Sequence, residues 1–358
     1  MRILIVCIAK IKYTPYIDFY INNINCKNNQ VDVVYWNRDL EPENIPYKNV
    51  NFIEFKASQK DEQSKFFKIK NFIKYHFFVK KYLKQKYDRV VVLNSQTAAL
   101  FWLCLLRWYK EKYVFDFRDI TYERFFIFRK MIASLVKNSF FTSISSDKFR
   151  LVMPQKYEHK IFVNHNILKD SLSHRNIEHS SNESVIRIAF WGFIREKELN
   201  AEFIKKVAKD KRFELHYYGR EEQVALSLKA LVKDIEAANV FFHGEYKQEE
   251  RYEFVKKTDI IHNVYGQSKN MLLAMSNKFY DGPIFYLPQL CMEGSFMGEV
   301  AEKELIGISC NPYKEGFLDQ IYDYYMKLDK NTFSSNCDRH LSKCLNEVEI
   351  VKEKLNQW

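Results

Sequence analysis

Residues 185–192 read VIRIAFWG, a run of apolar and β-branched residues that ends in a glycine. Similar runs recur downstream: FELHYYG (213–219), NVFFHG (239–244), DIIHNVY (259–265), PQLCM (288–292) and IGISCN (306–311). Helix-like segments lie between or after them, at 198–210, 221–237, 247–257 and 314–328. Near-continuous apolar strands that alternate with helices are typical of a parallel sheet covered on both faces.

The first half of the chain shows the same alternation. Its strand-like runs are 2–9, 31–36, 89–94, 113–119, 140–145 and 160–166, and its clearest helix-like segments are 62–86 and 97–110. Residues 170–184, DSLSHRNIEHSSNES, are polar in the way that linkers are. We therefore predict an α/β protein with two parallel-sheet domains: a first domain 1–172, a linker 173–184, a second domain 185–330 and a helical tail 331–358.

The net charge of +11 is concentrated in the first half. Residues 1–180 hold 31 Lys and Arg against 17 Asp and Glu, whereas residues 181–358 hold 25 against 28. Such an uneven charge distribution indicates the kind of binding partner rather than the fold. A basic half fits an anionic membrane surface, a phosphorylated lipid or a nucleic acid.

The seven cysteines form neither a CxxC pair nor a zinc-like spacing, and several lie in apolar runs. We expect buried free thiols in a reducing cytoplasm. The longest apolar run, 98–106, is about half of the length that a membrane-spanning helix needs. The N-terminal MRILIVCIAKIKY lacks a small-residue cleavage site, so it indicates a first buried strand rather than a signal peptide.

Three of the second-half runs end in a glycine, at the position where open parallel sheets bind ligands. Glycine lets the backbone approach a phosphate, and Arg or Lys neutralises its charge. A chain reversal would explain each glycine taken alone, but the succession favours a phosphate-binding edge. The residues at these ends are Gly192, Phe193, Arg195 and Lys197; Tyr218, Gly219 and Arg220; and His243, Gly244, Glu245 and Tyr246.

The stretch SNKFYDG (276–282) lies between two apolar runs. Ser276 is a typical helix N-cap, which leaves Asn277 and Lys278 at a helix start that favours anions. Asp281 follows one turn later. The phosphate-binding patterns GxxxxGK[ST] and GxGxxG are absent after the first strand, which argues against a P-loop kinase or a standard dinucleotide enzyme.

In this order the motifs resemble the nucleotide-binding half of GT-B glycosyltransferases, especially family four and its capsular and exopolysaccharide relatives. The matching pieces are AFWGFIRE (189–196), FELHYYGR (213–220), VFFHGEYKQEE (240–250), SNKFYDGPIFYLPQLC (276–291) and GSFMGEVAEKELIGISCN (294–311). In the first half, FDFRD (115–119) and SISS (143–146) also fit.

The resemblance implies two Rossmann-like domains that face a cleft, with a nucleotide-sugar donor, a UDP-sugar above all, on the second domain. The first domain would bind the glycan or lipid-linked acceptor, and neither a metal nor another cofactor would be needed. In the donor-binding segment that Ser276 caps, Asn277 and Lys278 would meet the donor diphosphate, and Asp281 would bind the ribose. Gly192, Phe193, Arg195 and Lys197 would face the phosphates or the sugar. The donor base would lie near Tyr218, Gly219, His243, Glu245 and Tyr246. Arg220 and Gly244 would also belong to the donor-binding residues.

One position departs from the family-four pattern, which has two glutamates eight residues apart. Here Asp281 occupies the second position and Leu273 the first. The residue pattern therefore leaves retention and inversion of the sugar configuration both open.

The first half supplies the catalytic candidates Asp119, Glu123 and His165. Asp119 or Glu123, in FDFRDITYERF, would deprotonate an acceptor hydroxyl if the enzyme inverts. An Arg–Asp pair that orients a loop is the alternative. His165 precedes the linker, and a purely structural histidine is the alternative there.

The segment 62–86 has Phe66, Ile69, Phe72, Ile73 and Val79 at helical spacing, with eight lysines mostly elsewhere. Either the apolar stripe packs on the sheet, or the helix lies on an anionic bilayer. The two are compatible if the stripe faces inward and the lysines face lipid. The aromatic cluster 122–136 would likewise touch a lipid tail or fill the core.

The leading hypothesis is a bacterial hexosyltransferase of surface polysaccharide synthesis, cytoplasmic and peripheral at the inner face of the plasma membrane. A nucleotide-sugar 2-epimerase of the same fold is the enzymatic alternative. A basic nucleic-acid-binding protein ranks last, because the sequence contains no recognised nucleic-acid module and we expect no nucleic-acid partner.

Overall fold

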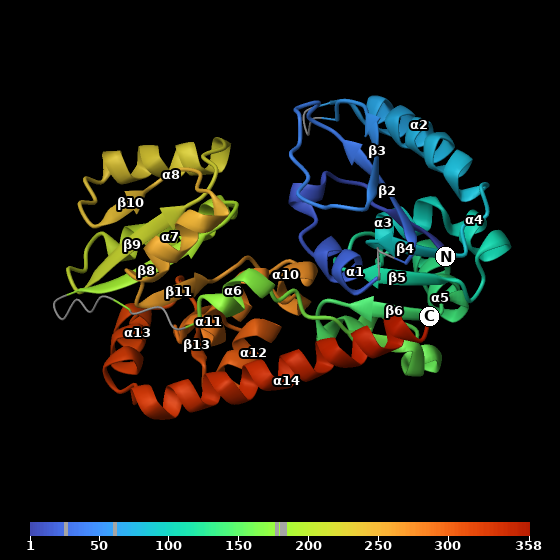
Figure 1. Cartoon of the computed structure of the whole chain (residues 1–358). Coiled ribbons are helices and arrows are strands. Elements are labelled where there is room, and N and C mark those ends of the chain that lie inside the picture. Colours follow the sequence, from blue (N-terminus) through green and yellow to red (C-terminus); the bar gives the residue numbers. More distant parts are fainter. Residues whose placement is uncertain (25–27, 60–62, 176–178, 180–184) are drawn as a thin grey trace. The chain divides into compact units, whose positions relative to one another are not determined.

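The computed structural model describes residues 1–24, 28–59, 63–175, 179 and 185–358 (Figure 1). It divides into two compact units. The first consists of Met1–Asn166 together with Leu345–Trp358, and the second of Ile167–Cys344. The predicted linker 173–184 falls largely outside the described residues, while its first residue ends the short helix α6 (Lys169–Ser173).

The first unit is built on a seven-stranded sheet in which every pairing is parallel. In sheet order the strands are β3 (Asn51–Lys56), β2 (Gln30–Asn37), β1 (Arg2–Val6), β4 (Arg89–Leu93), β5 (Tyr113–Phe117), β6 (Phe141–Ile144) and β7 (Ile161–Val163). Sequence reasoning missed β3, an edge strand whose residues are only half-buried or exposed and so lack a continuous apolar run.

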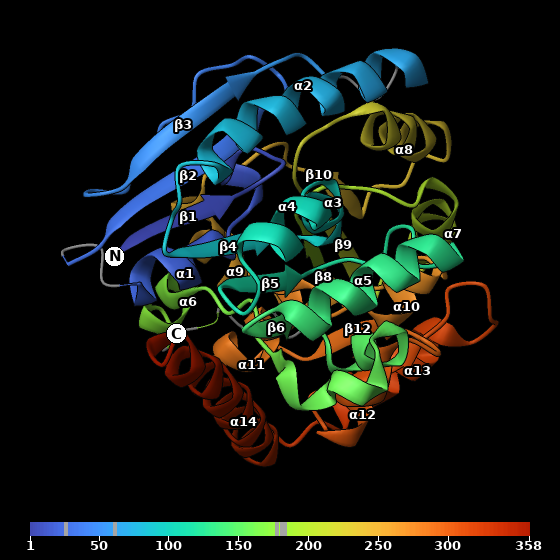
Figure 2. The ribbon, with the colours of Figure 1, turned by 90° about the vertical axis from the view of Figure 1, so that its right-hand side faces the viewer.

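Helices cover both faces of this sheet. One face carries α2 (Lys65–Leu83), α4 (Trp102–Trp108) and α5 (Phe126–Asn138), which lie in front of the strands in Figure 2. The other face packs against α1 (Ile17–Asn23) and the last turns of α14 (Lys330–Asn356). The segment predicted as one helix over 97–110 is two helices, α3 (Ser95–Leu100) and α4, which meet at Phe101.

The second unit has a six-stranded sheet, again with only parallel pairings. In sheet order its strands are β10 (Val240–Phe242), β9 (Phe213–Tyr218), β8 (Ile186–Trp191), β11 (Ile260–Asn263), β12 (Gln289–Met292) and β13 (Gly307–Cys310). The chain order reverses direction between β8 and β11. In open α/β sheets, ligands bind beyond the carboxyl ends of the strands at such a switch point.

Each face of the second sheet has its own helices. The face of Phe190 packs against α7 (Lys197–Val207), α8 (Gln223–Asp234) and α13 (Phe317–Met326). The face of Trp191 packs against α9 (Arg251–Val255) and α11 (Asn277–Phe285). Two further helices, α10 (Lys269–Leu273) and α12 (Phe296–Lys303), follow β11 and β12. The helix predicted over 247–257 is shorter, a 3-10 turn at Gln248–Glu250 followed by α9.

Only part of the apolar stripe expected on α2 packs on the sheet. Val79 is buried and the half-buried Phe72 meets Trp36 at a centroid distance of 5.3 Å, but Phe66, Ile69 and Ile73 are exposed. The buried face consists instead of Asn71, Tyr75, Val79 and Leu83. Tyr75 decides this orientation, because its ring stacks on Trp36 at a centroid distance of 5.2 Å and its hydroxyl donates to the carbonyl of Cys7 (2.5 Å).

Six of the cysteines are described, and all six are free and buried, as predicted; Cys26 lies outside the described residues. Within the described ranges, no helix is both long and apolar enough to cross a membrane.

The C-terminal helix contributes to the cores of both units. Near its start, Phe333 and Cys337 pack with α12 in the second unit. Near its end, Val351, Leu355 and Trp358 pack with the strands β1 and β2 of the first unit. The predicted tail 331–358 is thus divided between the units.

Truncation of Leu355 tests this role of the helix. Leu355→Ala should lower the free energy of unfolding by about 2–5 kcal/mol, because it removes buried methyl groups and leaves a cavity. Thermal or urea denaturation measures the change. Glu353→Ala, at an exposed position of the same helical turn, is the control and should change little. Equal stability of the two variants would contradict the packing described here.

Candidate functional site

Three glycines shape the carboxyl edge of the second sheet. The Gly192 N–H donates to the carbonyl of Tyr218 (2.8 Å), and the Gly219 N–H donates to the carbonyl of Gly244 (2.8 Å). A Cβ at Gly219 would lie 1.8 Å from the Gly192 carbonyl oxygen, so only glycine allows this approach. Gly192 and Gly244 have φ values of +121° and +78°. The predicted glycine ends therefore meet at one edge.

Basic side chains flank this edge. The guanidinium carbons of Arg195 and Arg220 lie 4.7 Å and 5.2 Å from the ring centroid of Phe193. Arg220 also pairs with Glu222 at 3.3 Å. Lys197 is exposed at the first position of α7. Phe193 thus holds two cations next to Gly192, where an anion would meet the backbone.

An aromatic stack follows the second and third strands. The ring of Tyr218 is stacked on His243 (centroids 4.2 Å apart) and on Phe254 (4.0 Å), and Tyr246 meets Phe254 edge-on. Because His243 and Phe254 occupy both faces of the Tyr218 ring, it has no face left to stack on a base. His243, Gly244, Glu245 and Tyr246 line a cavity of about 510 Å³ beside this stack.

The stretch SNKFYDG opens α11. The hydroxyl of Ser276 accepts from the Phe279 N–H (3.2 Å) and caps the helix. The same hydroxyl lies 3.2 Å from the amide oxygen of Asn263, and Asn263 donates to Gln289 (2.7 Å). A buried polar chain thereby fixes the start of α11 to β11 and β12, and Asn277 stays exposed at the first helical position.

Lys278 is buried at 9% exposure, yet its ammonium donates no hydrogen bond to any described residue. Its Nζ lies 3.2 Å from the ring centroid of Phe190 and 5.2 Å from that of Tyr265. Burial lowers the pKa of Lys278 well below its usual value, and the nearby charge of Asp281 opposes this only in part. A cation without an acceptor in an aromatic environment is costly.

The position of this ammonium follows from the sheet. The helix α11 packs on the face of Trp191, but Lys278 reaches Phe190, whose side chain points to the opposite face. Lys278 therefore passes over the carboxyl edge, between the ends of β8 and β11. Burial lowers the pKa of the neighbouring His262 to about 3, and Lys278 acts in the same direction, so His262 supplies no charge at neutral pH.

Asp281 is buried at 4% exposure on the other side of the edge. Its Oδ2 accepts from the indole N–H of Trp191 (2.9 Å) and lies 3.7 Å from Arg251. Burial raises the pKa of Asp281, while Arg251 and the Trp191 hydrogen bond lower it. Oδ1 has no hydrogen bond among the described residues. The carboxylate is thus held in place through one oxygen, and the other remains available to a ligand.

Sequence reasoning missed Trp191 and Arg251. Trp191 stands directly before Gly192, where it reads as one more apolar strand residue. Arg251 lies in a charged segment that reads as a solvated helix, although it is buried and donates to the Ser171 hydroxyl (2.6 Å). Their shared contact, Asp281, is 90 and 30 residues away along the chain, so no local pattern reveals it.

The catalytic candidates lie at the carboxyl ends of β5 and β7 in the first unit. Asp119 is exposed, whereas Glu123 is buried and accepts from the Thr121 N–H (2.5 Å). His165 lies 2.6 Å from Glu347 of α14, a partner that the sequence does not indicate. The strand β6 separates β5 from β7, so Asp119 and His165 do not follow neighbouring strands.

The Arg–Asp pair expected as an alternative is formed by Asp116 and Arg118, which lie at the end of β5 just before Asp119. Arg118 and Asp116 pair at 2.9 Å, and both are buried. Ser143 also donates to Asp116 (2.7 Å), and Arg118 donates to the carbonyl of Asn164 (3.2 Å). This pair ties together the ends of β5, β6 and β7 and leaves Asp119 outside it.

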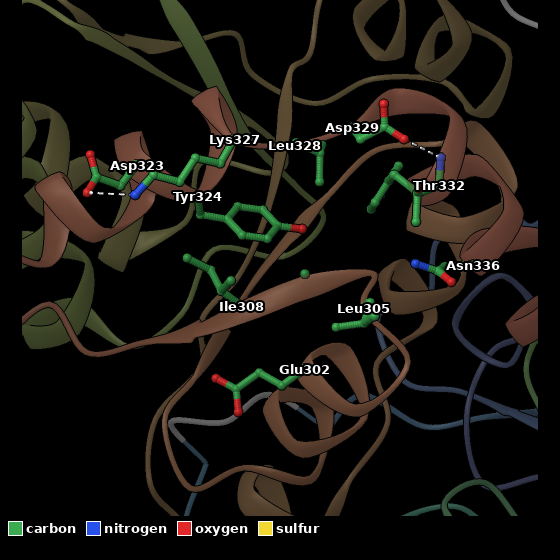
Figure 3. A pocket seen from close by; sticks show the side chains of 12 residues that line it. Glu302, Leu305, Ile308, Asp323, Tyr324, Lys327, Leu328, Asp329, Thr332 and Asn336 are labelled. Carbon is green, nitrogen blue, oxygen red and sulfur yellow. Dashed lines mark hydrogen bonds and ion pairs between the residues drawn. The ribbon is translucent and has the colours of Figure 1, made fainter.

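The cavity in Figure 3 lies elsewhere in the second unit. It measures about 610 Å³, lies beside the edge strand β13 and is lined from α12, α13 and α14, including Leu305, Ile308 and Tyr324. Its lining is mainly apolar near the amino end of β13, and none of the predicted site residues borders it.

The sequence matches no protein-family model and no curated protein sequence. Solved structures match almost the whole chain. Sucrose-phosphate synthase from Thermosynechococcus elongatus aligns with a TM-score of 0.72 and 9% identity over 100% of this chain and 98% of that one. HepE from Anabaena in complex with UDP aligns with a TM-score of 0.69 and 10% identity over 100% of both chains. WaaG, a glycosyltransferase involved in lipopolysaccharide biosynthesis, aligns with a TM-score of 0.65 and 12% identity over 98% of this chain and 99% of that one.

The chain has the GT-B fold. The two parallel-only sheets and the structural neighbours confirm the fold that the motifs indicated. In this GT-B chain, the unpartnered ammonium of Lys278 lies at the switch point of the second sheet, and the half-engaged carboxylate of Asp281 lies one helical turn away.

Replacement of Lys278 by an apolar residue of similar length tests the cost of this ammonium. Lys278→Met should raise the free energy of unfolding at pH 7 by roughly 1–3 kcal/mol, because it removes a buried charged group without a hydrogen-bond partner. Lys269→Met, at an exposed position of α10, is the matched control and should change little. Thermal denaturation compares the three proteins.

The advantage of Lys278→Met should shrink as the pH rises towards 10.5. Folded Lys278 holds its proton more weakly than unfolded Lys278, so the unfolded state binds more protons in this window and the stability of the native chain rises with pH. A variant that is less stable than the native chain, or an advantage independent of pH, would contradict an unpaired buried ammonium.

Proposed function

We propose that the chain is a glycosyltransferase that moves a hexose from a UDP-sugar to a lipid-linked or oligosaccharide acceptor in bacterial surface polysaccharide synthesis. The observation that carries this proposal is the position of Lys278. Its buried ammonium has no acceptor in the described protein and lies at the switch point, where doubly wound sheets bind ligands. An anion such as a diphosphate would supply the missing acceptor.

The neighbouring groups have fitting roles. The N-terminus of α11, with the exposed Asn277, adds N–H donors and a positive dipole end next to Lys278. Gly192 leaves room for the phosphates, with Arg195 close by. Oδ1 of Asp281 would accept from a ribose hydroxyl, while Trp191 and Arg251 hold Oδ2. Glu245 and Tyr246 border the cavity on the side proposed for the base.

In the proposed reaction, the bond between the anomeric carbon and the diphosphate oxygen breaks, and a bond to the acceptor oxygen forms. The diphosphate leaves with the electron pair, and Lys278 and Arg195 stabilise its charge. The acceptor hydroxyl gives its proton to a base of the first unit. We take Asp119 as this base, because its side chain is exposed, whereas Glu123 is buried. We propose that no metal takes part.

The structural neighbours support the class of donor and acceptor. HepE has been solved with UDP and with UDP-glucose, and WaaG is involved in lipopolysaccharide biosynthesis. A lipid-linked acceptor would place the reaction at the inner face of the plasma membrane. The basic first half fits the anionic surface there.

A panel of nucleotides tests the donor. UDP and UDP-sugars should raise the melting temperature of the native chain more than GDP- or CMP-sugars do, with or without EDTA, because a ligand that binds only the folded state stabilises it. Lys278→Met should weaken UDP binding by roughly tenfold or more, the loss of one charge-assisted contact to phosphate. Lys269→Met should bind UDP as the native chain does.

Three outcomes would overturn the proposal. One is the absence of binding to every nucleotide-sugar in the panel. Another is unchanged UDP affinity in Lys278→Met. The third is conversion of UDP-N-acetylglucosamine to its 2-epimer without any acceptor, visible by NMR, which would identify an epimerase of the same fold instead.

A further inference from the structure

The outward face of α2 carries a row of large apolar side chains. Phe66, Ile69, Ile73 and Phe77 recur at spacings of three and four residues, which places them on one side of the helix. Their exposed fractions are 87%, 56%, 51% and 60%. A helix whose opposite face is already buried through Tyr75 and Leu83 would normally present polar residues here.

Lysines flank this row on one side. Lys70, Lys74 and Lys81 fall beside it at helical spacing, and none of them pairs with a carboxylate of the described residues. The nineteen residues of α2 include no Asp or Glu. An apolar row with an uncompensated basic flank is the pattern of helices that lie in the interface of an anionic bilayer.

A second patch of the same kind begins α5. Phe125, Phe126 and Ile127 are exposed by 51%, 60% and 74%. The guanidinium of Arg124 lies 4.7 Å from the Phe125 ring centroid, and the Lys130 ammonium lies 4.5 Å from that of Phe126. This helix also contains no acidic residue.

The two patches belong to one side of the first unit. Both helices cover the same face of its sheet (Figure 2), and each begins beyond the carboxyl end of a parallel strand, α2 after β3 and α5 after β5. Phe66, in the first turn of α2, and Phe125, which precedes α5, therefore both lie at the carboxyl edge of the sheet. This is also the edge that carries Asp119, the proposed base.

We infer that the α2 row and the α5 patch form a docking surface for an anionic phospholipid bilayer, with the aromatic and aliphatic side chains inserted and the lysines at the headgroups. Of the two orientations that the sequence left open for this helix, the exposed row corresponds to the one on a bilayer, with apolar side chains as well as lysines towards the lipid. The inference deepens the proposed function and rests on it only for the lipid-linked acceptor, which the surface would bring to the edge of Asp119.

Charge and shape favour a bilayer over other occupants. Anionic headgroups attract the positively charged lysines, and aromatic side chains are well suited to the headgroup region. A nucleic acid would be held by the lysines alone and would not need the apolar row. A second copy of the chain would bring the same uncompensated lysines to the interface.

Vesicle co-sedimentation of the full chain tests the surface. The native chain should bind vesicles of phosphatidylcholine and phosphatidylglycerol, mixed at about two to one, and should bind pure phosphatidylcholine much more weakly. Replacing Phe66, Ile69, Ile73 and Phe77 together by Ser should weaken binding to the anionic vesicles by roughly tenfold or more. These positions are exposed, so the melting temperature should stay close to that of the native chain.

Two matched controls come from the second unit. Leu226→Ser changes an exposed apolar residue of α8 and should leave vesicle binding intact. Replacing Lys70, Lys74 and Lys81 by Gln should weaken binding to anionic vesicles, whereas the same change at Lys205, Lys209 and Lys211 should not.

Several results would overturn the inference. They are equal binding to both kinds of vesicle, no loss of binding in the serine variant, or self-association of the native chain that the serine variant abolishes without any vesicle binding. Tight binding to generic duplex DNA that the serine variant retains would also overturn it. UDP binding separates this test from that of the proposed function: if the chain binds UDP but no vesicles, only the docking surface is lost.

Discussion

The site depends on one unfavourable interaction, the burial of the Lys278 ammonium against Phe190 without a hydrogen-bond acceptor in the described protein. The fold tolerates it because the surrounding groups are held independently. Ser276 is fixed to Asn263, and Asp281 is fixed to Trp191. A rigidly held ammonium without an acceptor is a preorganised anion-binding site, because few groups have to move when the ligand binds.

The strand order determines where this cation lies. Both sheets have the doubly wound order, and the second one changes direction between β8 and β11. The helices after β8 and β11 therefore leave towards opposite faces, and a gap opens between them at the carboxyl edge. The three glycine turns keep side chains away from that edge, and the length of a lysine lets α11 reach it from the other face.

Much of this fold could be predicted from the sequence, because buried parallel strands such as RILIV and RVVVL read as continuous apolar runs. The glycine ends and the capped start of α11 were visible for the same local reason. Interactions between distant segments were not visible, as the contacts of Asp281 with Trp191 and of His165 with Glu347 illustrate. The orientation of α2 stayed open because helical periodicity shows which residues share a face, but only Tyr75 meeting Trp36 decides which face is buried.

The most direct test of the central claim is proton uptake when UDP binds. A diphosphate beside Lys278 favours its charged form and should raise its lowered pKa. Calorimetric titrations of UDP in buffers of different ionisation enthalpy, between about pH 7 and 10, should show protons taken up on binding. The uptake should vanish in Lys278→Met. Binding of UDP without proton uptake at any pH in this range, or uptake that the variant retains, would contradict the account.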